Sequence, residues 1–212
     1  MIKIFCLILL TVQVSTLSSQ VSTTEFDVKN WVAPYSLPTN SGWDVERFMI
    51  PISFAPGITY HGIEDIRFAP GWGKVSTTDY WSYAFLWFLN ESPDFNSKRI
   101  KKNLQLYYTG LIGSNIEKRK IPANKLFQTK ASIKKMKTEK GDLKTFSGSI
   151  YMLDYMEQKP ITLNCKVHVK SCSGLPNMFI FYEISPQPWS GEIWKSLDKL
   201  WQDFDCSNKE KK

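Results

Sequence analysis

The segment at residues 80–89, YWSYAFLWFL, limits most strongly what this chain can fold into. On an extended chain Trp81, Phe85 and Trp87 lie on one side, and Leu86 and Phe88 lie on the other. A strand that is apolar on both sides has to be covered on both sides. We therefore predict a sheet in which residues 80–89 form a central strand, with further structure packed on each face.

Eight other segments have the periodicity of a strand or a helix. The expected strands are residues 47–54, 63–68, 130–137, 146–156, 161–169 and 178–184. The expected helices are residues 96–112, capped by Asn96 or Ser97, and 191–204, capped by Ser190. These elements predict an α+β fold, in which two amphipathic helices pack on an antiparallel sheet. Pro51 places the first strand at a sheet edge.

Two variants of this fold remain open. A Ser-Pro pair precedes each expected helix, at residues 92–93 and 185–186, as an internal duplication of a βββα unit would produce. Alternatively, a curved sheet or small barrel closed by the C-terminal helix would enclose a ligand cavity.

Residues 1–19 have the three parts of a cleavable export signal: Lys3, an apolar run at 4–14, and small residues at 15–19. This run is shorter than the roughly 20 residues with which a helix spans a bilayer, and no later segment is long and uncharged enough. We predict a secreted protein, periplasmic or extracellular, with no transmembrane segment. The expected parts that follow are an extended arm at residues 20–42 that docks through Trp31 and Tyr35, one compact domain at 43–206, and a polar tail at 207–212.

Three cysteines follow the export signal, and their surroundings differ. Cys165 lies on the apolar side of the strand at residues 161–169, whereas Cys172 lies in the turn that follows. The C-terminal helix is about as long as the strand at 178–184, so a helix that packs back along that strand returns Cys206 to the turn. We predict a disulfide between Cys172 and Cys206 and a buried free thiol at Cys165.

Residues 60–79, YHGIEDIRFAPGWGKVSTTD, hold the densest collection of His, carboxylate, Arg, Gly and Trp in the chain. His61 could act as a general base, with Glu64 or Asp65 as the acid or orienting group. The candidate ligand-binding residues are Arg67, Trp72, Asp79 and Trp81. On an extended chain Asp65 and Arg67 share a face, so the simpler interpretation is an ion pair on a solvated strand.

No motif specifies a metal or a cofactor, and we predict neither. The histidines, His61 and His168, are not at the spacing of a metal motif. His168 lies on the polar side of its expected strand, where we expect it to be solvated. Neither a dinucleotide fingerprint nor a nucleophile elbow occurs, and Cys172 is better explained by the disulfide.

The basic residues are concentrated in one stretch. Thirteen Lys and Arg lie between Lys98 and Lys140, against only Glu117 and Glu139. Such a stretch either forms a solvated face or binds an anionic polymer through charge. The export signal argues against nucleic acid as the partner.

Three functional hypotheses follow. The first is a secreted, non-catalytic binding or accessory protein, whose ligand, a small molecule, glycan or protein, is bound around residues 60–79. The second is a hydrolase-like enzyme that uses His61 with Glu64 or Asp65. The third is adhesion to an anionic surface polymer through residues 98–140. The sequence does not decide whether the protein is an enzyme.

Overall fold

The computed structural model describes residues 30–206; the predicted export signal at 1–19, the first part of the arm and the polar tail lie outside the described residues. The strands are β1 (Asp44–Ile50), β2 (Gly62–Phe68), β3 (Tyr83–Leu89), β4 (Lys130–Lys135), β5 (Lys144–Asp154), β6 (Lys159–Ser171) and β7 (Met178–Ser185). The helices are α1 (Ser97–Gly113) and α2 (Glu192–Gln202), with a short 3-10 turn, η1, at Ala123–Lys125.

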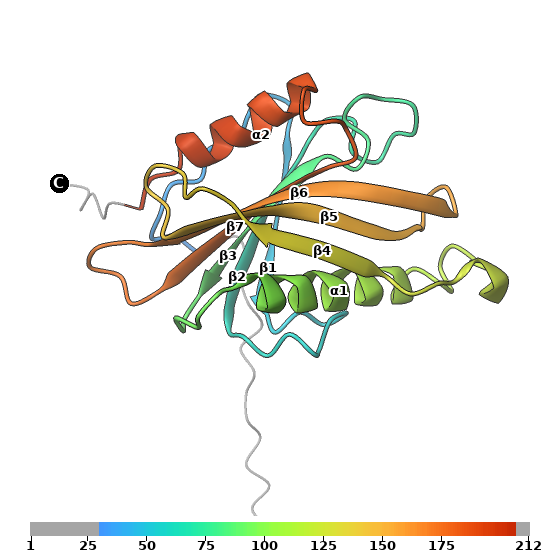
Figure 1. The fold of residues 1–212 in the computed structure, drawn as a ribbon, viewed down its shortest axis with the longest axis horizontal. Helices are drawn as coiled ribbons and strands as arrows, with labels where there is room; N and C mark the ends of the chain where they lie inside the picture. The colour runs from blue at the N-terminus through green and yellow to red at the C-terminus, as the bar shows by residue number, and fades with distance from the viewer. Residues whose placement is uncertain (1–29, 207–212) are drawn as a thin grey trace, which may run out of the picture.

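The strands form one antiparallel sheet in the order β1-β2-β3-β7-β6-β5-β4, with one helix on each face (Figure 1). The predicted α+β class is confirmed. The barrel variant is wrong, because β1 and β4 are the free edges of an open sheet.

The central strand predicted from the two apolar sides is β3, which lies between β2 and β7. Tyr83, Phe85 and Trp87 belong to the core on the α1 face, whereas Leu86 and Phe88 belong to the core on the α2 face. Fully burying one such side chain contributes roughly 1.5–3 kcal/mol. The two rows of β3 therefore hold structure against both faces of the sheet.

The strand β1 is an edge strand, as Pro51 predicted, but it ends at Ile50 rather than at Phe54. Proline has no N–H with which to continue the ladder, so the chain turns there towards α1. A Cβ on Gly110 of α1 would lie 1.9 Å from the Phe54 carbonyl oxygen. The helix thus packs directly on this turn and holds Phe54 beside it.

Both helices begin close to their predicted positions. Asn96 caps α1, and its Oδ1 accepts a hydrogen bond from the Arg99 N–H at 3.0 Å. The chain is still extended at Gly191, which immediately precedes α2, so the predicted cap Ser190 lies one position too early. Within residues 30–206, neither helix is long and apolar enough to cross a membrane.

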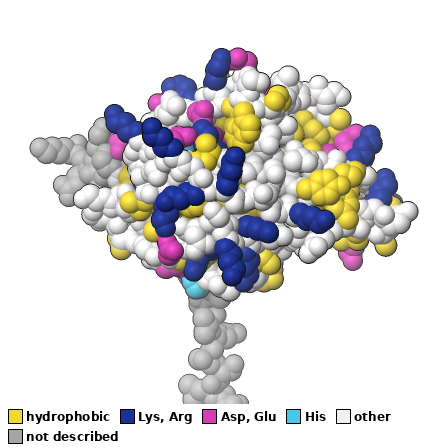
Figure 2. All heavy atoms as spheres, in the orientation of Figure 1, with side chains coloured by type: hydrophobic (Ala, Val, Ile, Leu, Met, Phe, Trp, Pro, Cys, Tyr) yellow, Lys and Arg dark blue, Asp and Glu magenta, His cyan; other side chains and the backbone are white. Residues whose placement is uncertain are grey.

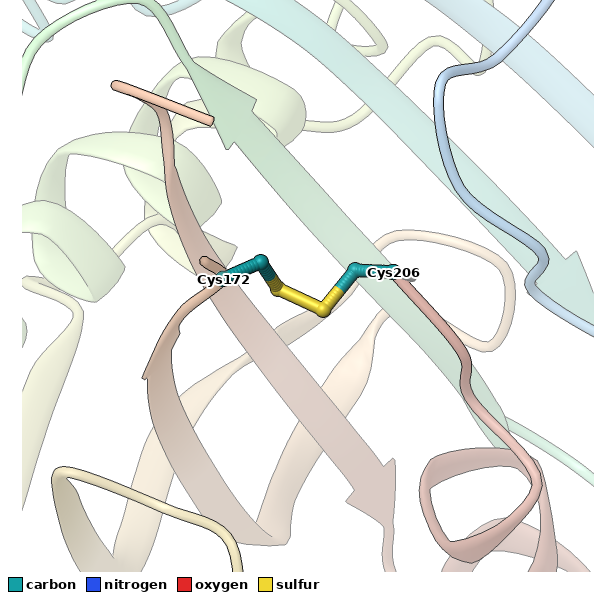
Figure 3. Close-up of a disulfide and its surroundings, with 2 residues drawn as sticks. All are labelled: Cys172 and Cys206. Atoms are coloured by element: carbon teal, nitrogen blue, oxygen red, sulfur yellow. A yellow bond between two sulfur atoms is a disulfide. The ribbon is translucent and has the colours of Figure 1, made fainter. Parts of the chain in front are cut away.

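Cys172 and Cys206 form the predicted disulfide, with their Cα atoms 6.1 Å apart (Figure 3). It joins the turn after β6 to the segment after α2, as expected if the helix packs back along the sheet. Cys165 is a buried free thiol, and burial raises its pKa to about 12. This thiol therefore stays protonated at neutral pH.

The described part of the arm packs on the α2 face. Tyr35 and Leu37 belong to the core on that face, and Trp31 packs against it. The Ser36 N–H also donates to the Asp205 carbonyl oxygen at 2.6 Å, and the Asp205 N–H donates back at 2.9 Å. Backbone pairing thus holds the arm in addition to the side chains that the sequence indicated.

The two halves of the chain share an order of three strands followed by a helix, with β4 as an addition. However, α1 and α2 lie on opposite faces of the sheet (Figure 1). A two-fold axis that exchanges the antiparallel neighbours β3 and β7 would put both helices on the same face. Such an axis therefore does not relate the two halves with their helices.

Candidate functional site

The loop between β2 and β3 brings two tryptophans together. The backbone N–H of Trp81 donates to the backbone carbonyl oxygen of Trp72 at 2.8 Å, and this hydrogen bond joins the two ends of the loop. A Cβ on Gly71 would lie 2.5 Å from the Thr77 Oγ1, which donates to the Gly71 carbonyl oxygen at 2.9 Å. The ring centroids of Trp72 and Trp81 lie 6.5 Å apart, and the rings are nearly perpendicular, at 81°.

These two rings border a pocket of about 170 Å³ between the sheet and α1. Its lining consists of eight aromatic, two aliphatic and one acidic side chain. One set of rings in contact comprises Phe68, Trp72, Trp81 and Tyr155, and a second comprises Phe48, Phe54 and Tyr107. Because α1 packs mainly against β4 and β5, it leaves the corner of the sheet at β1 and β2 for the pocket.

Trp81 has two unusual features. Its side chain is buried, and among the described residues its Nε1 makes no hydrogen bond of normal geometry, although the indole lies beside the Tyr80 hydroxyl. Its φ is 54°, in the left-handed region that bulky residues rarely adopt. Unpaired buried donors and strained backbone both tend to occur at functional sites. Trp81 is therefore the residue of this lining that most needs an explanation beyond packing.

Two carboxyl groups accompany the pocket. Glu46 is exposed and is the one charged side chain in the lining. Glu64 is fully buried and accepts hydrogen bonds from the Tyr107 hydroxyl (2.7 Å) and the Trp87 Nε1 (2.9 Å). Burial raises the pKa of Glu64 to about 8, although both hydrogen bonds favour the ionised form. The Glu64 carboxyl is thus mostly neutral at pH 7, while Tyr107 connects it to the pocket wall.

The other predicted site residues do not meet at this pocket. His61 is exposed, and its Nδ1 lies 3.9 Å from the Glu91 Oε1. Among residues 30–206 no hydrogen bond or ion pair joins His61 to Glu64 or Asp65. Asp79 borders a separate cleft of about 490 Å³ beside the start of α2. The structure therefore brings together Trp72 and Trp81 from the predicted set and separates the proposed base from the proposed acids.

Asp65 and Arg67 form the expected ion pair, but the pair is buried rather than solvated. The guanidinium of Arg67 donates to the carbonyl oxygens of Leu37 and Pro38, each at 3.0 Å. The Tyr35 hydroxyl donates to the Asp65 Oδ2 at 3.2 Å. The arm thus covers this side of β2, and the ion pair holds the arm in place.

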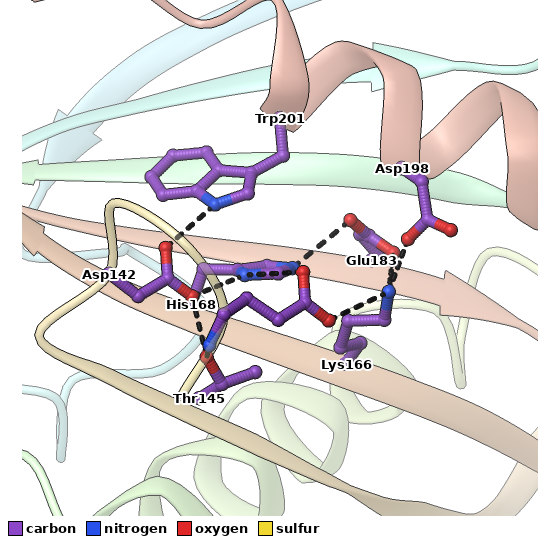
Figure 4. A network of polar contacts seen from close by, with 8 residues as sticks. Asp142, Thr145, Lys166, His168, Glu183, Asp198 and Trp201 are labelled. Carbon is purple, nitrogen blue, oxygen red and sulfur yellow. Dashed lines mark hydrogen bonds and ion pairs between the residues drawn. The ribbon is translucent and has the colours of Figure 1, made fainter. Parts of the chain in front are cut away.

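A second polar cluster lies beneath α2 (Figure 4). The His168 Nδ1 lies 2.7 Å from the Asp142 Oδ2, and its Nε2 lies 3.2 Å from the Glu183 Oε1. Lys166 pairs with Asp198 of α2 and lies 3.8 Å from the Glu183 Oε2. The expectation that His168 is solvated is wrong, because α2 and the segment before β5 cover the polar side of β6.

The cluster shifts the pKa values of its members. Burial opposes a charge on His168, but the hydrogen bonds to Asp142 and Glu183 outweigh it and raise its pKa to about 9. Burial also acts against the charge on Asp142, yet the hydrogen bond with His168 lowers its pKa. The sequence contained one sign of this cluster: Glu183 is an acid within the apolar run FIFYEI, where a buried acid requires a partner.

The basic stretch is divided between α1, the following loops and β4. The lysines of β4 lie on an edge strand, where charged side chains hinder pairing with another sheet. Lys98, Arg99 and Lys102 border a cleft of about 360 Å³ beside the start of α1. Figure 2 shows Lys and Arg side chains dispersed over one face of the molecule, with fewer Asp and Glu among them.

Among residues 30–206, no group of His, Cys, Asp and Glu side chains is arranged to hold a metal ion. No model of a known protein family matches the chain, and neither a curated protein nor a solved structure is significantly similar to it. The candidate site therefore has to be interpreted from its own geometry.

Proposed function

We propose that this protein is a secreted, non-catalytic binding protein that holds a small, largely apolar ligand in the pocket beside Trp72 and Trp81. The observation that carries the proposal is the lining, in which eight aromatic rings surround about 170 Å³. Ligand pockets are typically preformed and apolar, with a few polar groups that orient the ligand. The disulfide between Cys172 and Cys206 supports secretion, since disulfides persist in oxidising compartments.

The base and the buried acid suggested by the sequence do not reach the pocket, which favours binding over catalysis. A general acid or base has to reach the substrate, directly or through one water molecule. Glu64 is fully buried behind Tyr107, and His61 lies elsewhere on the surface. Glu46 and the unpaired Trp81 Nε1 remain as groups that orient a ligand.

The test is a titration with 4-fluorobenzyl alcohol, a small neutral aromatic probe, followed by ¹⁹F NMR. We expect saturable binding to the wild type and affinity at least about tenfold weaker in Trp72→Ala, since an aromatic wall contributes about 1.4 kcal/mol or more. Trp189→Ala is the matched control, because Trp189 is exposed and packs on Trp194 of α2 rather than at the pocket. Circular dichroism and thermal unfolding establish that both variants fold.

A second variant fills the pocket instead of removing a wall. Leu111 of α1 is a partly buried lining residue, so Leu111→Trp places a larger side chain where the ligand would lie. We expect this variant to lose the probe while retaining the fold. Equal binding of the probe by the wild type, Trp72→Ala and Leu111→Trp would show that the pocket is not the binding site.

The cleft beside α1 supports a second candidate function, adhesion to an anionic polymer. Lys98, Arg99 and Lys102 border it, and none of them has a carboxylate oxygen within 4.0 Å among the described residues. The triple variant Lys98→Gln, Arg99→Gln and Lys102→Gln is compared with Lys130→Gln, Lys134→Gln and Lys135→Gln on β4 by heparin chromatography. We expect strong, salt-sensitive retention that the first variant loses and the second keeps. Elution of the wild type at low salt would rule this function out.

A further inference from the structure

We propose that the ligand of the aromatic pocket is an organic cation: a substituted ammonium compound that also carries one oxygen able to accept a hydrogen bond. This inference rests on the proposed binding function and specifies its ligand. It combines three properties of the lining, which are the orientation of the rings, the sign of the charge and the unpaired donor.

The rings around Trp81 meet at steep angles, an arrangement that suits a cation. Aromatic faces are electron-rich, and a cation within about 6 Å of a ring centroid is attracted to it, most strongly by tryptophan. Trp81 lies at 81° to Trp72 and at 73° to Tyr155, whose ring centroid is 5.1 Å away. Rings at such angles can enclose a compact group from more than one side, whereas parallel rings would form only a slot.

The charge at the pocket has the sign that a cation requires. Glu46 is the charged side chain in the lining, and neither Lys nor Arg belongs to the lining. This is notable in a chain with a formal net charge of +7. An acidic side chain in the lining repels anions and attracts cations.

One ring of the lining already binds a cation. The guanidinium of Arg119 lies over the Tyr155 ring, 5.1 Å from its centroid. Arg119 is not itself part of the lining, so the pocket stays open to a ligand. Its positive charge opposes that of a bound cation, and Arg119→Gln should therefore strengthen rather than weaken binding of a cation.

The unpaired donor restricts the ligand further. The Trp81 Nε1 is buried and makes no hydrogen bond of normal geometry, although the Tyr80 hydroxyl lies beside it, and a ligand oxygen in line with this donor would complete the missing hydrogen bond. The lining otherwise contains few polar groups, so it does not match the many hydroxyl groups of a glycan. A volume of about 170 Å³ admits a compact head group rather than a polymer.

The test compares choline with 3,3-dimethylbutan-1-ol, an uncharged molecule of nearly the same shape, by isothermal titration calorimetry on the full mature chain. We expect choline to bind at least about tenfold more tightly than the alcohol. Glu46→Gln should weaken the affinity for choline about threefold or more and leave the affinity for the alcohol unchanged. Glu192→Gln is the matched control, because Glu192 is exposed on α2 at the other face of the sheet.

The outcomes separate this inference from the function on which it rests. Equal affinity for choline and the alcohol, or equal affinity for choline in wild type, Glu46→Gln and Trp72→Ala, would overturn the organic cation. If 4-fluorobenzyl alcohol still binds to the wild type but not to Leu111→Trp, the proposed binding of an apolar ligand survives that result. If neither choline nor 4-fluorobenzyl alcohol binds, both proposals fail.

Discussion

Glu64 and Asp65 are neighbours in β2, both are completely buried, and their side chains lie on opposite faces of the sheet. Asp65 is surrounded by cations, since it pairs with Arg67 and lies 2.9 Å from the Arg47 Nε. Within residues 30–206, Glu64 has only the neutral donors Tyr107 and Trp87, and burial raises its pKa to about 8. The protein thus buries one acid between two guanidinium groups and the next as a mostly neutral carboxyl.

The same contrast extends over the two faces. On the α2 face, charged side chains join separate parts of the chain: Arg67 holds the arm, and His168 joins β6, β7 and the segment before β5. On the α1 face, aromatic rings and a neutral acid surround the pocket. Ion pairs on one face hold the structure together, and the other face keeps a preformed space of low polarity.

The largest effect should come from breaking the ion pair on the α2 face. In Arg67→Met, the carbonyl oxygens of Leu37 and Pro38 lose their donor, and Asp65 keeps Arg47 and the Tyr35 hydroxyl. Removing one partner of a buried pair typically costs about 3–5 kcal/mol, and we expect a loss of this size in the free energy of unfolding by urea.

Arg47→Met is the matched control for this prediction. The Arg47 side chain is 27% exposed, and without it Asp65 still pairs with Arg67. We expect the free energy of unfolding of Arg47→Met to be about 1 kcal/mol lower than that of the wild type. If the two variants lose the same amount, the buried guanidinium does not hold the arm in the way the contacts indicate.

The next effect concerns His168. Its pKa of about 9 lies above the ordinary value of 6.5, so the folded protein binds this proton more tightly than the unfolded chain does. The resulting stability is fully present below pH 6.5 and is lost as the pH rises through about 9. The free energy of unfolding of His168→Gln should therefore be roughly 3 kcal/mol lower than that of the wild type at pH 6.5, and this difference should shrink progressively up to pH 10.

Unfolding of the wild type and the variant by urea, at steps between pH 6.5 and 10, measures this difference. The carboxylates that face His168 are Asp142, Glu183 and Glu139, and the ring of Trp201 packs on the imidazole. Lys166 pairs with two of these acids, Glu183 and Glu139. His61→Gln is the control, because His61 is exposed and its replacement should change the free energy of unfolding little. A loss in His168→Gln that stays constant to pH 10 would mean that the imidazole acts through packing alone.

Much of the fold could be predicted from periodicity. Periodicity is visible in residues that are close in the sequence. It shows the apolar residues on both sides of β3, on one side of β6 and along one face of α2. The disulfide between Cys172 and Cys206 followed from the lengths of adjacent elements. The ion pair of Asp65 and Arg67 followed from their positions two residues apart on a strand.

What covers each face could not be predicted in the same way. The polar side of β6 looks solvated until α2 is placed over it, so the burial of His168 depends on contacts between distant segments. The arm likewise covers Asp65 and Arg67. The sequence suggested Trp72 and Trp81 as walls of a ligand site, but Tyr107 and Tyr155 reach the pocket from α1 and the end of β5. That the pocket binds a ligand stays a prediction.

The smallest effect should have the opposite sign. Because the pKa of Glu64 lies at about 8 rather than 4.5, the unfolded chain releases this proton before the folded protein does. Stability of the wild type therefore falls as the pH rises from about 4.5 to 8, whereas Glu64→Gln has no proton to lose. We expect Glu64→Gln to be about 2 kcal/mol more stable than the wild type at pH 7, the linkage gain less the cost of one weaker hydrogen bond.

Asp65→Asn is the matched control, because it makes the same change from acid to amide one residue away. Asp65 pairs with Arg67 and Arg47, so the free energy of unfolding of Asp65→Asn should fall by about 3 kcal/mol at pH 7, whereas that of Glu64→Gln should rise. Urea unfolding at pH 4.5, 7 and 8.5 gives both values, and the gain in Glu64→Gln should vanish at pH 4.5. A loss in both variants at pH 7 would show that Glu64 is ionised in the folded protein, and that the two faces of β2 do not differ in how they bury an acid.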